Sequence, residues 1–99
     1  MLNINKTENG SELTFAMEGR LDTTTAPELE AVIRESLAGV TALNIDMAAL
    51  DYISSAGLRV LLSAQKIMNK QGEMKVIHVS ETIMEIFEVT GFSDILTIE

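Results

Sequence analysis

The segment from Asp51 to Leu62, DYISSAGLRVLL, constrains the fold of this chain most, because a strand pattern changes there into a helix pattern. In its second half, leucines recur at helical spacing (Leu58, Leu61 and Leu62). Ser54 is the expected N-cap, so Ser55 becomes the first helical residue. A hydroxyl at that position lies beside backbone N–H groups without helical partners, where an added phosphate is tolerated. From the spacing alone, Ser55 is either small filler after an ordinary cap or a serine that is modified.

The flanking segments alternate between strand and helix patterns. Asn9-Gly10 separates two alternating runs and predicts a hairpin. Thr25 and Glu28, with a proline between them, predict a capping box at the start of a helix that ends near Gly39. Later segments are expected as a strand over 43–47, a helix over 55–71 ended by a left-handed Gly72, a strand over 74–79, a helix from Ser80 to Gly91, and a last strand over 94–98.

This order of segments predicts an α/β fold in which a β-hairpin is followed by three βα units. Strands joined through helices are parallel, so we expect a mixed five-stranded sheet. Polar alternation in the second and third strands predicts helices mainly on one face. The turns after the parallel strands should share one edge, which would place Asp22, Ser55 and His78 together. The predicted core includes Ile45, Leu58, Leu61, Leu62, Val76 and Phe87.

Composition narrows the possible classes of protein. The 99 residues form one expected domain, 1–99, and the absence of cysteine excludes disulfides and thiolate metal sites. We expect no metal and no cofactor. The net charge of −8 argues against nucleic acid as a partner. No signal peptide is evident, and charged and polar residues interrupt the apolar region over 40–64, so we predict a cytoplasmic protein without membrane insertion.

Two catalytic hypotheses can be drawn from the same edge of the sheet. Ser55, His78 and Asp22 could form a hydrolase triad, but the chain lacks the G-x-S-x-G nucleophile elbow. Asp51 could accept a phosphoryl group as in a response-regulator receiver, but no adjacent acid pair follows the first strand to bind Mg²⁺. Both hypotheses are weaker than a binding module that is not an enzyme.

Ser55-Ala56-Gly57-Leu58 resembles the signature turn of the STAS family of anti-sigma factor antagonists, and GRLD (Gly19 to Asp22) resembles its second short motif. The resemblance covers essentially the whole chain and implies a STAS domain. Members of the family often carry aspartate before the phosphorylated serine, where this chain has Ser54, so Ser54 is the alternative acceptor. A regulatory subunit of a membrane transport system, which also occurs in this fold family, is the alternative function.

The resemblance implies an anti-anti-sigma factor. Its unphosphorylated form would bind an anti-sigma factor serine kinase and free the sigma factor, and phosphorylation of Ser55 would switch it off. A PP2C-type phosphatase would restore the active form. The implied partner-binding residues are Asp22, Thr23, Thr24, Ser54, Ser55, Ala56, Gly57 and Arg59.

Overall fold

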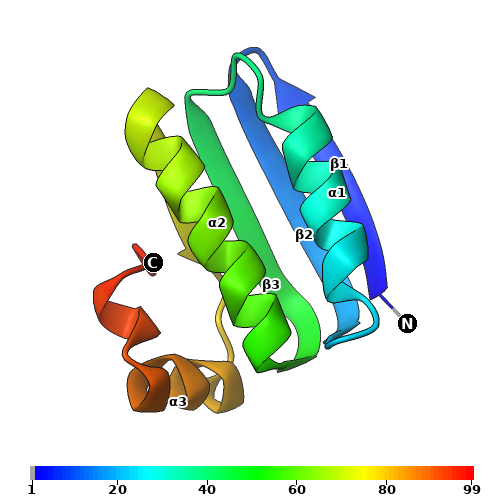
Figure 1. The fold of residues 1–99 in the computed structure, drawn as a ribbon, viewed down its shortest axis with the longest axis vertical. Helices are drawn as coiled ribbons and strands as arrows, with labels where there is room; N and C mark the ends of the chain where they lie inside the picture. Colours follow the sequence, from blue (N-terminus) through cyan, green and yellow to red (C-terminus); the bar gives the residue numbers. More distant parts are fainter. Residues whose placement is uncertain (1) are drawn as a thin grey trace.

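The computed structural model describes residues 2–99, which form four strands and three α-helices (Figure 1). In chain order the elements are β1 (Leu2–Asn9), β2 (Glu12–Leu21), α1 (Ala26–Ser36), β3 (Ala42–Ile53), α2 (Ser55–Gln71), β4 (Glu73–Ile77), α3 (Glu81–Thr90) and the 3₁₀ turn η1 (Phe92–Asp94).

The sheet has the strand order β1-β2-β3-β4. β1 and β2 form the predicted antiparallel hairpin, in which Asn9 pairs with Glu12 and Gly10 occupies the loop with a φ of 65°. β2 pairs in parallel with β3, and β3 with β4. The mixed α/β sheet is therefore as predicted from the alternation of segments.

The predicted fifth strand is wrong. Residues 94–98 contribute only an isolated bridge between Val76 and Ile98. The backbone N–H of Leu96 donates instead to the Phe92 carbonyl (2.9 Å), which curls this segment through η1 before it reaches β4. The bridge consists of two backbone hydrogen bonds. Val76 N–H donates to the Thr97 carbonyl, and Glu99 N–H donates to the Val76 carbonyl (2.8 and 2.9 Å). The 3₁₀ turn thus uses backbone hydrogen-bonding groups that a fifth strand would need for pairing with β4.

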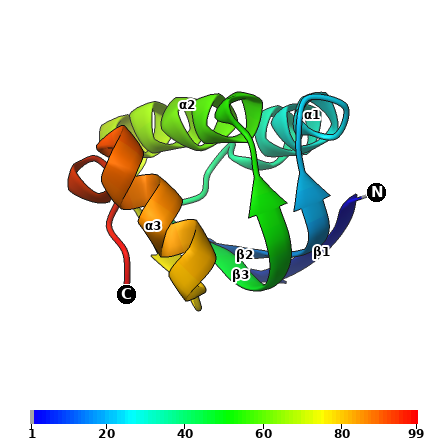
Figure 2. The same ribbon diagram turned by 90° about the horizontal axis from the view of Figure 1, so that it is seen from below.

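Helices α1 and α2 cover one face of the sheet (Figure 2), and α3 lies at the end of the molecule where α2 begins (Figure 1). Apolar side chains of β2 and β3 point toward the two helices, while alternate residues such as Thr14, Asn44 and Asp46 are half-buried on the other face. The predicted placement of helices mainly on one face agrees with this arrangement. Leu62 is the exception among the predicted core residues, because it is only half-buried, whereas Leu61 is fully buried.

The predicted bounds of α2 and the predicted caps of α3 agree with the structure, but the predicted left-handed conformation of Gly72 is wrong. Ser80 caps α3 through its side chain, and Gly91 ends that helix in the left-handed region. Gly72 instead has an extended φ of 174°. A Cβ added there would fall on the Thr41 carbonyl, so glycine is needed for close approach between chain segments and not for a left-handed turn.

Candidate functional site

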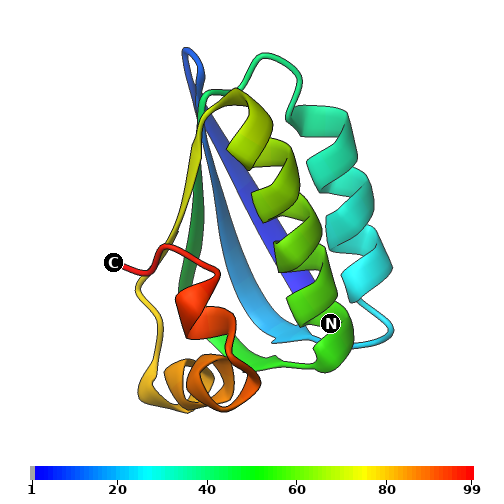
Figure 3. The ribbon, with the colours of Figure 1, turned by 60° about the vertical axis from the view of Figure 1, so that its left-hand side comes forward.

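The candidate site is built where β2 and β3 end side by side. Leu21 pairs with Ile53 at the end of the two strands, and the backbone N–H of Ser54 donates to the Leu21 carbonyl at 2.8 Å. The loop after β2 and the start of α2 are therefore neighbours. Figure 3 shows both at the same end of the molecule as α3.

The two serines at the start of α2 have different environments. Ser54 is half-buried, its carbonyl accepts from Leu58 N–H at 3.0 Å, and its hydroxyl accepts from Gly57 N–H at 3.4 Å. Ser54 is thus the N-cap, as predicted. Ser55 is exposed at the first helical position, and the first turn of α2 contains no acidic residue. A negative group on Ser55 would meet the positive end of the helix without repulsion from that turn.

Gly57 brings this helix end close to the sheet. The residue is buried, and a Cβ placed on it would lie 2.7 Å from Leu21 Cγ and 2.9 Å from Ile53 Cγ1. Its predicted role in partner contact is untested, and its buried position assigns it to supporting the turn from below. The small residue of the motif therefore has a packing reason that is independent of any partner.

Asp22 organises the loop between β2 and α1. Its Oδ1 accepts from Thr24 N–H, Thr24 hydroxyl and Thr25 N–H at 3.0, 2.7 and 3.1 Å. The Thr24 hydroxyl bond is the largest cause of a lowered Asp22 pKa, desolvation opposes it, and the backbone donors reinforce it. The predicted capping box at Thr25 is wrong, because the Thr25 hydroxyl donates to the Arg20 carbonyl at 2.9 Å and does not cap α1.

Arg20 and Tyr52 lie next to the loop that Asp22 organises, and their pairing was not predicted from the sequence. Arg20 and Tyr52 are register partners on β2 and β3, and the guanidinium lies 4.5 Å from the centre of the tyrosine ring. Arg20 Nε also lies 3.8 Å from Asp22 Oδ2. Tyr52 keeps 37% of its surface exposed. Arginine and tyrosine are frequent energetic centres of protein interfaces, and only the strand register could have revealed this pair.

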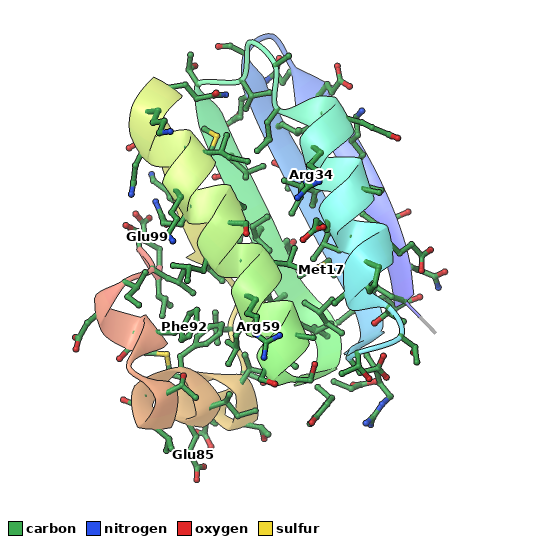
Figure 4. All side chains as sticks on the ribbon, viewed as in Figure 1. Met17, Arg34, Arg59, Glu85, Phe92 and Glu99 are labelled. Carbon is green, nitrogen blue, oxygen red and sulfur yellow. The ribbon has the colours of Figure 1, made fainter. Side chains whose placement is uncertain are left out.

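A groove of about 210 Å³ runs between the first halves of α1 and α2. Its lining residues are Thr23, Ala26, Pro27, Glu30, Ala56, Arg59 and Val60. Figure 4 shows Arg59 projecting from the first half of α2. The structure thus brings Thr23, Ala56 and Arg59, three of the predicted partner-binding residues, to one groove.

His78 does not lie with Ser55, so this part of the predicted edge is wrong. β4 ends at Ile77, which pairs with Asp46, whereas β3 continues to Ile53. The seven further residues of β3 correspond to about 23 Å of strand. The prediction of a shared edge assumed that the parallel strands end at the same level. Because His78 lies away from Ser55, the hydrolase hypothesis loses His78 as its general base.

The partner of His78 is Asp46. His78 has a positive φ of 57°, and its Nδ1 lies 3.0 Å from Asp46 Oδ1. Desolvation raises the pKa of Asp46, but the Ala48 N–H bond and the histidine outweigh it, and the net pKa is lowered. Within residues 2–99, no three His, Cys, Asp or Glu side chains gather as a metal site would require, and no helix is long and apolar enough to cross a membrane.

The sequence profile of the STAS domain family matches residues 3–99, and the chain belongs to this family. The resemblance seen in the sequence motifs is thereby confirmed. The fold agrees as well. The chain superposes with a TM-score of 0.77 on the Bacillus cell fate determinant SpoIIAA solved in its phosphorylated form, at 16% identity over 98% of this chain and 91% of that one.

Two curated relatives carry related names. A protein of Bordetella bronchiseptica, BtrV, is named provisionally as an anti-sigma factor antagonist and is 35% identical over 88 residues, which are 87% of this chain and 76% of the relative. The anti-sigma-B factor antagonist of Bacillus subtilis is 29% identical over 98% of this chain and 90% of its own length. The chain is therefore similar over nearly its whole length to bacterial regulators of sigma factors.

Proposed function

We propose that this STAS domain is an anti-sigma factor antagonist, whose unphosphorylated form binds an anti-sigma factor serine kinase and frees the sigma factor. The names of the curated relatives support this class. The observation that carries the proposal is the exposed Ser55 at the first position of α2, next to the loop that Asp22 organises. A partner can reach the hydroxyl and the loop at the same time.

The docking surface comprises exposed or half-buried residues of the two neighbouring loops and of the first two turns of α2. They are Asp22, Thr23, Thr24, Ser54, Ser55, Ala56 and Arg59. The protein itself catalyses no step in this scheme. The kinase supplies the phosphate, a PP2C-type phosphatase removes it, and all three proteins act in the cytoplasm.

Phosphorylation of Ser55 should change affinity and not the fold. A phosphoserine adds about −1.5 to −2 charges. The helix end accepts this charge, and Arg59 follows one turn later on the same helix, at the i,i+4 spacing that suits ion pairs. A partner that covers the neutral hydroxyl would have to desolvate the phosphate, which costs binding energy. SpoIIAA, of the same fold, has been solved in a phosphorylated form.

The acceptor can be identified by mass spectrometry after incubation with ATP and the kinase that unmodified protein retrieves from its host. We expect phosphate on Ser55 in the wild type and none in Ser55→Ala, because Ser55 is the exposed hydroxyl of the pair. Ser54→Ala should remain a substrate while losing about 0.5 to 2 kcal/mol of stability through the lost cap. Phosphate on Ser54 would contradict the assignment, and retrieval of a transporter component would overturn the function.

A second prediction concerns Asp22, whose carboxylate both holds the loop and carries charge. Asp22→Asn keeps an acceptor oxygen for the Thr24 and Thr25 donors, so its melting temperature should stay near that of the wild type. Its affinity for the kinase should fall if the partner recognises the charge. Asp22→Ala should lower both the melting temperature and the affinity for the kinase. Calorimetric titration with the kinase and thermal melts separate the effects, and unchanged binding of Asp22→Asn would limit Asp22 to shaping the loop.

A further inference from the structure

An apolar groove on α3 lies outside the docking surface and has no role in the function proposed above. The groove measures about 300 Å³ and is lined by Thr82, Glu85, Ile86, Val89 and Thr90. Val89 is 82% exposed, although neighbouring positions Ile83 and Phe87 on the inner side of the helix are fully buried. The helix therefore has one apolar side for the core and a second one that faces solvent.

The charged residues of α3 are all acidic. Glu85 lines it, and Glu81 and Glu88 are exposed on the same helix. After Lys75 the chain contains five acidic residues and no lysine or arginine. Figure 4 shows Glu85 projecting from the outer side of α3. Any surface that buries Val89 must therefore approach the acidic residues of α3, and α3 itself carries no lysine or arginine to offset them.

These features select among the possible occupants of the groove. A second copy of the chain would bring another net charge of −8 and another acidic groove, so self-association is opposed. Lining residues 82, 85 and 89 follow one another at intervals of three and four residues, and residues 86 and 90 are four apart. Side chains at these intervals form ridges along a helix, against which a second helix can pack. We propose that the groove on α3 binds a basic amphipathic helix, whose apolar side chains cover Val89 and Ile86 and whose lysine or arginine side chains pair with Glu85.

The position of the groove indicates which protein supplies that helix. Two ribbon views place α3 at the end of the molecule where the loop after β2 and the start of α2 emerge (Figures 1 and 3). A protein docked on Ser55 thus extends naturally over α3. The basic helix belongs to the anti-sigma partner, and this assignment rests on the function proposed above.

The ligand chemistry can be tested with a synthetic probe and the full chain. The probe is a Leu/Lys peptide of about 18 residues patterned as an amphipathic helix, and a Leu/Glu peptide with the same leucine positions is its control. In amide NMR spectra, the Leu/Lys peptide should cause saturable shifts centred on residues 81–90, and the Leu/Glu peptide should cause none. Shifts located elsewhere, absence of binding, or self-association through α3 would overturn the proposal.

Matched variants separate the groove from general charge attraction. Glu85→Lys and Glu35→Lys change the net charge equally, but exposed Glu35 lies on α1, outside the groove. We expect Glu85→Lys to weaken peptide binding about fivefold and Glu35→Lys to leave it nearly unchanged. Val89→Ser, at a site too exposed to support the core, should weaken binding about tenfold. Equal effects of the two lysine variants would refute the groove as the binding site of the peptide.

The same variants distinguish this inference from the proposed function. If the kinase phosphorylates Ser55 and binds Glu85→Lys as tightly as the wild type, the groove is not part of the docking site and only the inference fails. If the Leu/Lys peptide binds α3 but no kinase modifies Ser55, the proposed function fails and the basic-helix site stands.

Discussion

Leu61→Ala should lower the free energy of unfolding by about 2 to 5 kcal/mol. Leu61 is fully buried on the side of α2 that faces the sheet, so the truncation removes apolar contacts and leaves a cavity. Because the same helix begins at Ser55, the core beneath α2 also supports the candidate site. Urea denaturation at equilibrium measures the change, with an unchanged m-value as the sign that only stability has moved.

The neighbouring residue provides the control for this prediction. Leu62 has the same side chain on the same helix but is only half-buried, so Leu62→Ala should cost clearly less. A Leu61→Ala change within about 0.5 kcal/mol of zero, or equal losses in the two variants, would show that α2 presents a different face to the sheet.

Features set by local chemistry were predictable from the sequence. Ser54 and Ser80 each precede a helix and cap it through a side-chain oxygen, and Gly91 ends α3 in the conformation that glycine favours. These interactions join residues three or four positions apart, so the sequence contains both partners of each bond. The position of Ser55 at the start of α2 follows from the same local rule.

Features set by distant pairing were not predictable in the same way. The length of β3 beyond β4 displaced His78 from the edge that holds Ser55, and the curl through η1 reduced the fifth strand to one bridge. The contact of Arg20 with Tyr52 depends on the register between β2 and β3. The cap expected at Thr25 is a local feature that was predicted wrongly, because the Thr25 hydroxyl donates to the Arg20 carbonyl five residues earlier.

The architecture separates a packed support from the exposed Ser55, the proposed site of phosphorylation. Gly57 seats the start of α2 against Leu21 and Ile53, and Asp22 holds the adjacent loop through three hydrogen bonds. Ser55 is exposed, so the proposed phosphorylation would remove no core contacts. A change of charge there can alter binding while the fold remains intact.

This separation gives the last prediction, which concerns Ser55→Asp. A carboxylate at the first position of α2 is favoured by the helix dipole, so the melting temperature should stay close to that of the wild type. In the proposed complex the same carboxylate would be an unmatched charge that must lose its water. The affinity for the anti-sigma kinase should therefore fall by about tenfold to a hundredfold, as measured by calorimetric titration.

Ser63→Asp is the matched control, because Ser63 is an exposed serine on the same helix outside the docking surface and the substitution adds the same charge. It should bind the kinase nearly as well as the wild type. Similar losses of affinity for both variants would mean that overall charge, and not the position of Ser55, governs binding. A large drop in the melting temperature of Ser55→Asp alone would instead assign Ser55 to the stability of α2, and the switch would need another residue.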